Sequence, residues 1–212
     1  MRFFILIFIL TIISCRQTAK IPEDFDYGKT GNGIYKNDYF DFEIPVPDSW
    51  HVQNKEQIDQ IRKKGSDMIA ESNRGLAEKI KASDVGSAIL LAAYKNSTDS
   101  INEEYNPSFS IMAENLGSMS GVKKGKEYLI NVKKLMQKSG MTFSFPSGFY
   151  SQKVGNKEFD AMDVIMNING LECEQTYYSI VDKNFALGII VSSVGKEQKE
   201  TLKDIINKIK FK

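Results

Sequence analysis

The chain has 212 residues, of which 28 are Lys or Arg and 27 are Asp or Glu, and its formal net charge is +1. This balance, without a basic tract, argues against nucleic acid or an anionic bilayer surface as an electrostatic partner. Hydrophobic residues make up 42% of the chain and aromatic residues 11%, which is enough for a packed core and excludes a disordered stalk. The length fits one domain or at most two.

The chain opens with a positive charge followed by an apolar run. Arg2 precedes the mostly apolar residues 3–14, and this run is shorter than the ~20 residues that a membrane-spanning helix needs. Its length is instead typical of the apolar region of a signal peptide. The small side chain of Ser14 stands directly before Cys15, where a peptidase prefers a small residue.

The residues Ile12-Ile13-Ser14-Cys15 resemble the lipobox of bacterial lipoproteins. The resemblance implies cleavage before Cys15, a diacylglyceryl group on its sulfur and often an acyl group on its new amino group. Two or three acyl chains hold a protein on a membrane durably, whereas one chain binds only marginally. We therefore expect residues 1–14 to be a lipoprotein signal peptide and the mature protein to be anchored outside the cytoplasm. An ordinary secreted protein and a short uncleaved anchor are the alternatives.

The residues after Cys15 bear on the membrane and on the tether. If the cell is Gram-negative, Arg16 differs from the Asp that resembles an inner-membrane retention signal, which favours the outer membrane. Residues 15–36 are polar and lack periodicity, so we expect a lipidated Cys followed by a flexible tether reaching roughly 25 Å root-mean-square. A single α+β domain is then expected over residues 37–212.

Hydrophobic spacing predicts the elements of this domain. The long helix expected first should be weak or broken at Gly65 and Gly75. In chain order the predicted elements are a strand at 39–44, a helix at 55–81, strands at 88–94 and 108–113, a helix at 123–137, a hairpin, a strand at 185–192, a helix at 202–209 and a short strand at 210–212.

The hairpin has the clearest pattern. Gly155-Asn156 and Asn169-Gly170 are typical two-residue hairpin turns, because Gly and Asn tolerate positive φ. Setting Ile168 opposite Leu171 places one apolar face toward the core, since the side-chain period of a strand is two. On that face we expect the pairs Met166 with Cys173, Val164 with Gln175 and Met162 with Tyr177. The residues expected on the opposite, solvated face are Asp163, Asn167, Glu172, Glu174 and Thr176.

The order of elements indicates an α+β fold, an antiparallel meander flanked by helices. Several segments within residues 35–212 resemble the PsbP/Mog-like α/β/α sandwich proteins: Pro-Asp-Ser-Trp at 47–50, Asn-Pro-Ser-Phe-Ser at 106–110, GNKEFDAM at 155–162, QTYYSI at 175–180 and LKDIINKIKF at 202–211. Known members are non-catalytic partners, an extrinsic photosystem II subunit and a Ran-binding transport factor. The resemblance implies the fold and a tendency to bind rather than catalyse; neither specific role transfers, because the chain has no motif for either partner.

Two short motifs of a catalytic site are present, but their order along the chain does not fit that site. Ser120-x-x-Lys123 and Lys29-Thr30-Gly31 match parts of penicillin-binding and β-lactamase sites. Those enzymes place the Ser motif first, and Lys29 falls in the expected tether. Ser193-x-x-Lys196 matches the Ser motif as well, which shows how common it is. We therefore expect no catalytic residues.

Other reactive side chains are few. His51 is the single histidine, and we expect it to be a half-exposed packing residue, too isolated for a triad or a zinc site. With Cys15 lipidated, Cys173 has no disulfide partner, and we expect it to be a buried, inert thiol among apolar side chains. Glu172 and Glu174 share a strand face and are expected to be solvated. No metal or cofactor is expected.

An aromatic segment gives the candidate contact surface: Phe143, Phe145, Phe149 and Tyr150. Aromatic residues are enriched at protein interfaces, although packing into the core is the alternative for most of these rings. The function expected is a lipid-anchored, non-catalytic envelope protein that binds or helps assemble another envelope protein. The alternatives are a small-molecule-binding lipoprotein that uses a cleft between sheet and helix, and a hydrolase that uses Ser120 or Cys173.

Overall fold

The computed structural model describes residues 19–97, 105–119, 121–168 and 170–212. The expected signal peptide at 1–14, Cys15, Ser120 and Asn169 lie outside the described residues. Among the described helices, none combines the length and the apolar character that crossing a membrane requires.

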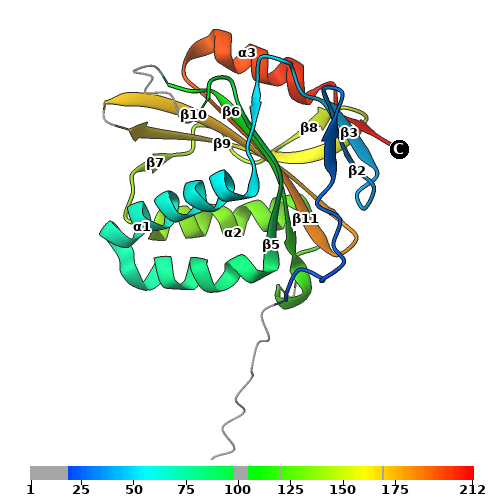
Figure 1. Ribbon diagram of the computed structural model, residues 1–212. Coiled ribbons are helices and arrows are strands. Elements are labelled where there is room, and N and C mark those ends of the chain that lie inside the picture. The colour runs from blue at the N-terminus through cyan, green and yellow to red at the C-terminus, as the bar shows by residue number, and fades with distance from the viewer. Residues whose placement is uncertain (1–18, 98–104, 120, 169) are drawn as a thin grey trace, which may run out of the picture.

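An antiparallel sheet of eight strands forms the centre of the molecule (Figure 1). Its order is β4-β5-β6-β11-β10-β9-β7, with β8 paired to β9. The strands are β4 (His51–Val52), β5 (Ser87–Tyr94), β6 (Ser108–Asn115), β7 (Phe143–Ser144), β8 (Tyr150–Val154), β9 (Lys157–Ile168), β10 (Leu171–Asp182) and β11 (Phe185–Ser193).

A second antiparallel sheet joins the two ends of the domain. Its order is β1-β2-β3-β12, so the last strand pairs with a strand near the beginning. The strands are β1 (Lys29–Gly31), β2 (Ile34–Asn37), β3 (Phe42–Pro45) and β12 (Lys210–Phe211).

The prediction of a flexible tether over residues 15–36 is wrong for the part that begins at residue 19. Phe25 and Tyr35 are buried in the core, and β1 and β2 form a hairpin inside residues 15–36 and just beyond. The side chain of Asp26 accepts hydrogen bonds from the backbone N–H groups of Gly28 and Asp38, which fastens the segment to the domain. The folded domain therefore begins before residue 37.

Three helices cover the two faces of the large sheet. The long α1 (Lys55–Ser83) and α2 (Gly125–Lys138) lie on one face, and α3 (Gly195–Ile206) lies with the small sheet on the other (Figure 1). Short 3-10 helices follow α1 at Asp84–Gly86 and β6 at Leu116–Ser118.

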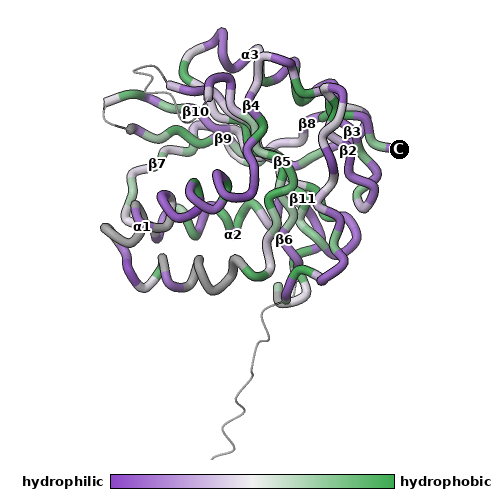
Figure 2. Tube along the Cα trace, viewed as in Figure 1, coloured by the Kyte–Doolittle hydropathy of each residue, from purple (hydrophilic) through white to green (hydrophobic). Residues whose placement is uncertain are grey.

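The alternation of side chains along β11 separates the two faces. Leu187 and Ile189 join the larger core, which lies under α3 and the small sheet, whereas Ala186 joins a smaller core under α2. In Figure 2 the strands at the centre are mainly hydrophobic, and the first half of α1 is mainly hydrophilic. The two cores bury apolar surface on both faces of the sheet, which is the main stabilising term in such a fold.

The predicted register of the long hairpin is confirmed. Ile168 is the partner of Leu171, and Met166 is the partner of Cys173. Some side-chain assignments on the hairpin are wrong. Leu171 is 40% exposed because it lies at the hairpin tip, and Thr176, expected in solvent, is buried on the α3 side of the sheet.

The long α1 is broken at Asn73 rather than at Gly65 or Gly75. Asn73 has φ −154° and ψ 84°, which are not helical. Its Oδ1 accepts a hydrogen bond of 3.0 Å from the backbone N–H of Leu76, so it acts as the N-cap of the second half. Its Nδ2 donates to the carbonyl of Lys138 at 2.8 Å, and this bond joins the break in α1 to the end of α2.

Candidate functional site

A cleft of about 600 Å³ lies between α1, α2 and the sheet face beneath them, and we call it the α2 cleft. Its floor comes from neighbouring strands: Met112 on β6, Gly188 and Ile190 on β11, and Tyr177 on β10. A β-carbon built on Gly188 would lie 3.3 Å from Cγ of Met112. A side chain at this position would therefore crowd Met112 on the cleft floor.

The wall of the α2 cleft is apolar. Leu129, Val132 and Leu135 follow one another along one side of α2, and Leu76 comes from the second half of α1. Leu129 and Leu76 are buried, whereas Leu135 is 41% exposed. The cleft therefore opens to solvent beside Leu135.

Several polar groups also line the α2 cleft. The hydroxyl of Tyr128 donates a hydrogen bond of 2.6 Å to Oε2 of Glu114. Burial, and then the nearby Glu114 carboxylate, raise the pKa of Tyr128 well above its ordinary value, so the phenol stays protonated. Asn131 and Lys138 are exposed where they border the cleft.

This combination of size and lining suits a small molecule with an apolar body. Pockets for such ligands typically have volumes of 300–1,000 Å³ and apolar walls with a few polar groups. Within the described ranges, no group of three or more His, Cys, Asp or Glu side chains could hold a metal ion.

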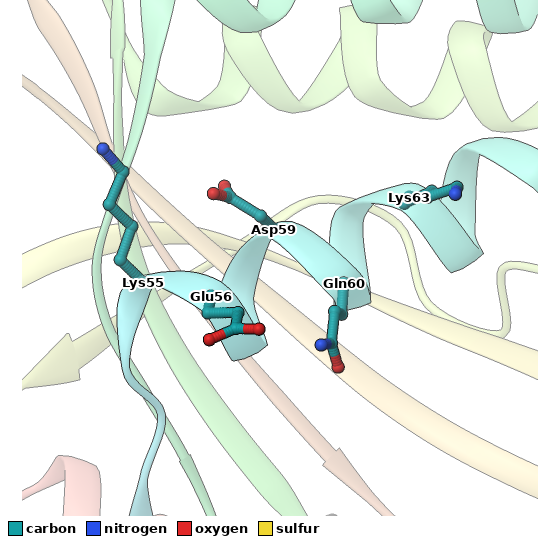
Figure 3. Close-up of a pocket in the computed structure, with 5 residues that line it drawn as sticks. All are labelled: Lys55, Glu56, Asp59, Gln60 and Lys63. Carbon is teal, nitrogen blue, oxygen red and sulfur yellow. The ribbon is translucent and has the colours of Figure 1, made fainter.

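Two other hollows lie outside the α2 cleft. One of about 500 Å³ lies on the first turns of α1, where Lys55, Glu56, Asp59, Gln60 and Lys63 are all exposed. Figure 3 shows these side chains pointing in different directions, without a common centre. The other, also about 500 Å³, lies between the start of α1 and β5. Arg62 borders it and donates a 3.4 Å hydrogen bond to the Ser87 carbonyl.

Cys173 is fully buried, as expected, and it lies opposite Met166, but it also contacts polar groups that the sequence pattern did not predict. Its thiol donates a hydrogen bond of 3.0 Å to Oη of Tyr105 and lies 3.4 Å from Oγ of Ser192. Gln175 donates to the same Ser192 oxygen at 3.0 Å, and Tyr177 donates to Gln175 at 2.7 Å. The thiol therefore belongs to a hydrogen-bond network that reaches Tyr177 on the floor of the α2 cleft.

The carboxylates of the hairpin are engaged within the fold. Asp163, expected in solvent, accepts hydrogen bonds from the hydroxyl groups of Ser147, Tyr150 and Thr176 at 2.8–3.0 Å. Glu174 forms an ion pair of 2.5 Å with Lys199 on α3, while Glu172 is exposed. The helix α3 covers this face, which the hairpin pattern alone did not indicate.

The aromatic segment packs against the molecule itself. Phe143, Phe145 and Phe149 are half-buried against the core under α2, and the ammonium group of Lys133 lies 4.4 Å from the Phe145 ring centre. Tyr150 packs on the opposite core and donates to Asp163. Their use as a contact surface stays a prediction.

The remaining reactive residues are dispersed. His51 is exposed on β4, and its backbone pairs with Tyr94. Lys29 is exposed on β1, while Ser193 is buried and Lys196 is exposed.

The residues of the α2 cleft were not identified from sequence. A single Gly within the strand 185–192 was a usable signal, because such a residue often marks a bulge or a close approach of backbone or ligand. Met112 and Glu114 gave no comparable signal, since their place in the cleft depends on how β6, β11 and α2 pack together.

No protein-family model matches the chain, and no curated protein matches it in sequence. Among solved structures it is similar to cyanobacterial PsbP (CyanoP) from Synechocystis sp. PCC 6803, with 8% identity, 87% of this chain and 98% of that chain covered and a TM-score of 0.50. LpqN of Mycobacterium tuberculosis, described as involved in cell envelope biogenesis, has 12% identity, 79% and 81% coverage and a TM-score of 0.42. A Pseudomonas aeruginosa protein of unknown function has 10% identity, 57% and 79% coverage and a TM-score of 0.41. The similarity to CyanoP confirms the expected PsbP-like α+β fold.

Proposed function

We propose that this chain is a lipid-anchored, non-catalytic binding protein of the bacterial cell envelope, and that the α2 cleft holds a small ligand with an apolar body. The observation that carries the proposal is the cleft itself, about 600 Å³ with an apolar floor and wall. The lipobox pattern ending at Cys15 supports the anchor and the location.

A small ligand is favoured over a protein partner by the form of the site. A cleft enclosed by two helices and a sheet suits a compact molecule, whereas protein interfaces bury broad surfaces of about 800 Å² per partner. The aromatic segment at 143–150 is half-buried against the chain's own cores, which reduces the area it can offer. Binding or assembly of another envelope protein is the second candidate.

A hydrolase is the weakest candidate. Cys173 is enclosed by Tyr105, Ser192 and Gln175, and none of these is a general base of the usual kind at neutral pH. Ser120 lies outside the described residues.

The test uses the chain from residue 15 onward with Cys15→Ser, which retains every described contact without the lipid. It is titrated with the apolar fluorophore N-phenyl-1-naphthylamine. We expect saturable binding at one site, weakened roughly tenfold or more by Leu135→Glu because a charge then lies at the cleft opening.

The matched control is Leu171→Glu. Leu171 is 40% exposed and Leu135 is 41% exposed, but Leu171 lies at the hairpin tip away from the cleft. Equal affinity of both variants and the parent, or the absence of saturable binding, would refute the cleft as the binding site.

A further inference from the structure

We propose that the ligand of the α2 cleft is one acyl chain of a membrane lipid. This inference rests on the proposed function and names the class of ligand. It follows from the shape of the cleft, the chemistry of its lining and the point at which the chain leaves the domain.

The α2 cleft is long enough and narrow enough for one chain. It follows α2 from Tyr128 to Lys138, and ten residues of helix advance about 15 Å. Its volume of about 600 Å³ corresponds to roughly 20 water-sized groups at about 30 Å³ each. This is room for a single chain rather than for a whole diacyl lipid.

The lining suits a flexible hydrocarbon. Met112 and Met119 contribute unbranched, adaptable side chains, and Val132 and Ile190 add apolar contact. The polar pair Tyr128 with Glu114, which also lines the cleft, is already joined by its own hydrogen bond. A chain without hydrogen-bonding groups would therefore leave this pair intact.

The N-terminal segment leaves the domain at one end of the α2 cleft. The N–H of Ile21 donates to the Val85 carbonyl at 2.9 Å, and Asn115 donates to the Lys20 carbonyl at 2.9 Å. The lining residues Ser87 and Glu114 lie within two positions of these contacts in the sequence. Figure 1 shows the first described residues at the same end of the molecule as the end of α1.

The anchor would hold this end of the cleft close to the bilayer. Ala19 lies four residues after Cys15, and four residues span at most about 14 Å. Tethering at so short a range makes the acyl chains of the membrane the apolar compounds of highest local concentration. Val85, which is 50% exposed at this end, adds an apolar group facing solvent.

The test uses the full lipidated protein, reconstituted into phosphatidylcholine vesicles in which one acyl chain carries a diazirine. After illumination, mass spectrometry locates the labelled peptides. We expect label on peptides containing residues 129–135 and 188–190. Gly188→Val, which fills the floor, and Leu135→Glu should each lower this label at least about fivefold, and Leu171→Glu should leave it unchanged.

Two results would overturn the inference. One is the absence of label from these peptides. The same result is expected if an acyl chain attached to Cys15 itself occupies the cleft, because only the phospholipid carries the diazirine. The other is undiminished label in Leu135→Glu, an exposed position whose variant should fold even if Gly188→Val does not. If the fluorophore binds saturably but the lipid leaves no label, the acyl chain is not the ligand and the proposed function still stands. If neither saturable fluorophore binding nor lipid label is found, the proposed function is refuted as well.

Discussion

Asp26 shows how one side chain can order a segment that looks like a tether in the sequence. Its carboxylate accepts hydrogen bonds from the backbone N–H groups of Gly28 and Asp38 at 2.8 Å and of Tyr39 at 3.3 Å. Partial burial opposes ionisation, but these N–H groups and the charge of Lys29 outweigh it, so the pKa of Asp26 is lowered. Backbone donors to a carboxylate are among the stronger hydrogen bonds in proteins.

We expect Asp26→Asn to lower the free energy of unfolding at pH 7 by about 1 kcal/mol, since one charged acceptor is lost and one neutral acceptor remains. A carboxyl with a lowered pKa stabilises the fold above its unfolded pKa, near 3.9, and loses that contribution as the pH falls through its folded pKa. The difference between parent and variant should therefore be constant above about pH 5 and shrink below about pH 4.

Urea unfolding followed between pH 2.5 and pH 7 checks this. The matched control is Asp24→Asn, two positions earlier and exposed, for which we expect no difference at any pH. If Asp26→Asn lowered the free energy of unfolding by the same amount at every pH, the charge of the Asp26 carboxylate would not be what holds the N-terminal segment on the domain.

At the scale of elements, the break in α1 is joined to the end of α2, where Lys138 borders the α2 cleft. Asn73 caps the second half of α1 and is hydrogen-bonded to the carbonyl of Lys138 at the end of α2. The second half of α1 brings Leu76 to the cleft wall. The cleft wall therefore depends on a single asparagine between two helices.

Replacing Asn73 with Ala removes both hydrogen bonds, and we expect the second half of α1 to open more readily. Loss of an N-cap costs about 1 kcal/mol, so amide exchange over residues 74–83 should quicken about fivefold, while residues 125–132 of α2 stay protected. Hydrogen exchange with mass spectrometry measures both.

Asn54→Ala is the matched control, because Asn54 caps the first half of α1 through reciprocal bonds of 3.0 Å with Gln57. Faster exchange there should be confined to the first half. Exchange that quickens uniformly along α1 in both variants would contradict the view that Asn73 divides it into two units.

Elements with their own periodicity were predictable. Residue pairs such as Met166 with Cys173 followed from alternation and turn chemistry, because the long hairpin carries its register locally. Strands near β3 and β12 were predicted, but β1 and β2 were missed because they are three and four residues long, and their sheet is completed by β12 from the opposite end of the chain. The break in α1 was misplaced because Asn73 is selected by its bond to Lys138, a tertiary contact that helix propensity does not contain.

At the scale of the whole molecule, the two faces of the large sheet are packed differently. The face under α3 and the small sheet carries the larger core, with ring contacts such as Phe42 with Phe211 at 5.6 Å. The other face carries the smaller core under α2 and the α2 cleft. The residues of the cleft could not be predicted from the sequence, because they come from six elements, from Leu76 to Ile190.

The short connection between Ala19 and Cys15 gives the molecule a defined orientation in the proposed function. The domain would stand on the membrane with one end of the α2 cleft near the lipid, rather than move freely on a long tether. The lipid on Cys15 and the ligand of the α2 cleft would then lie at the same end of the domain, and one experiment can detect both.

Mass spectrometry of the protein purified from its own membranes tests this account most directly. The denatured spectrum should show a chain beginning at Cys15 and bearing covalent acyl groups, and the native spectrum should add one non-covalent small molecule that Gly188→Val and Leu135→Glu lose and Leu171→Glu keeps. An unmodified Cys15, or a native mass without an adduct sensitive to the two cleft variants, would contradict the account.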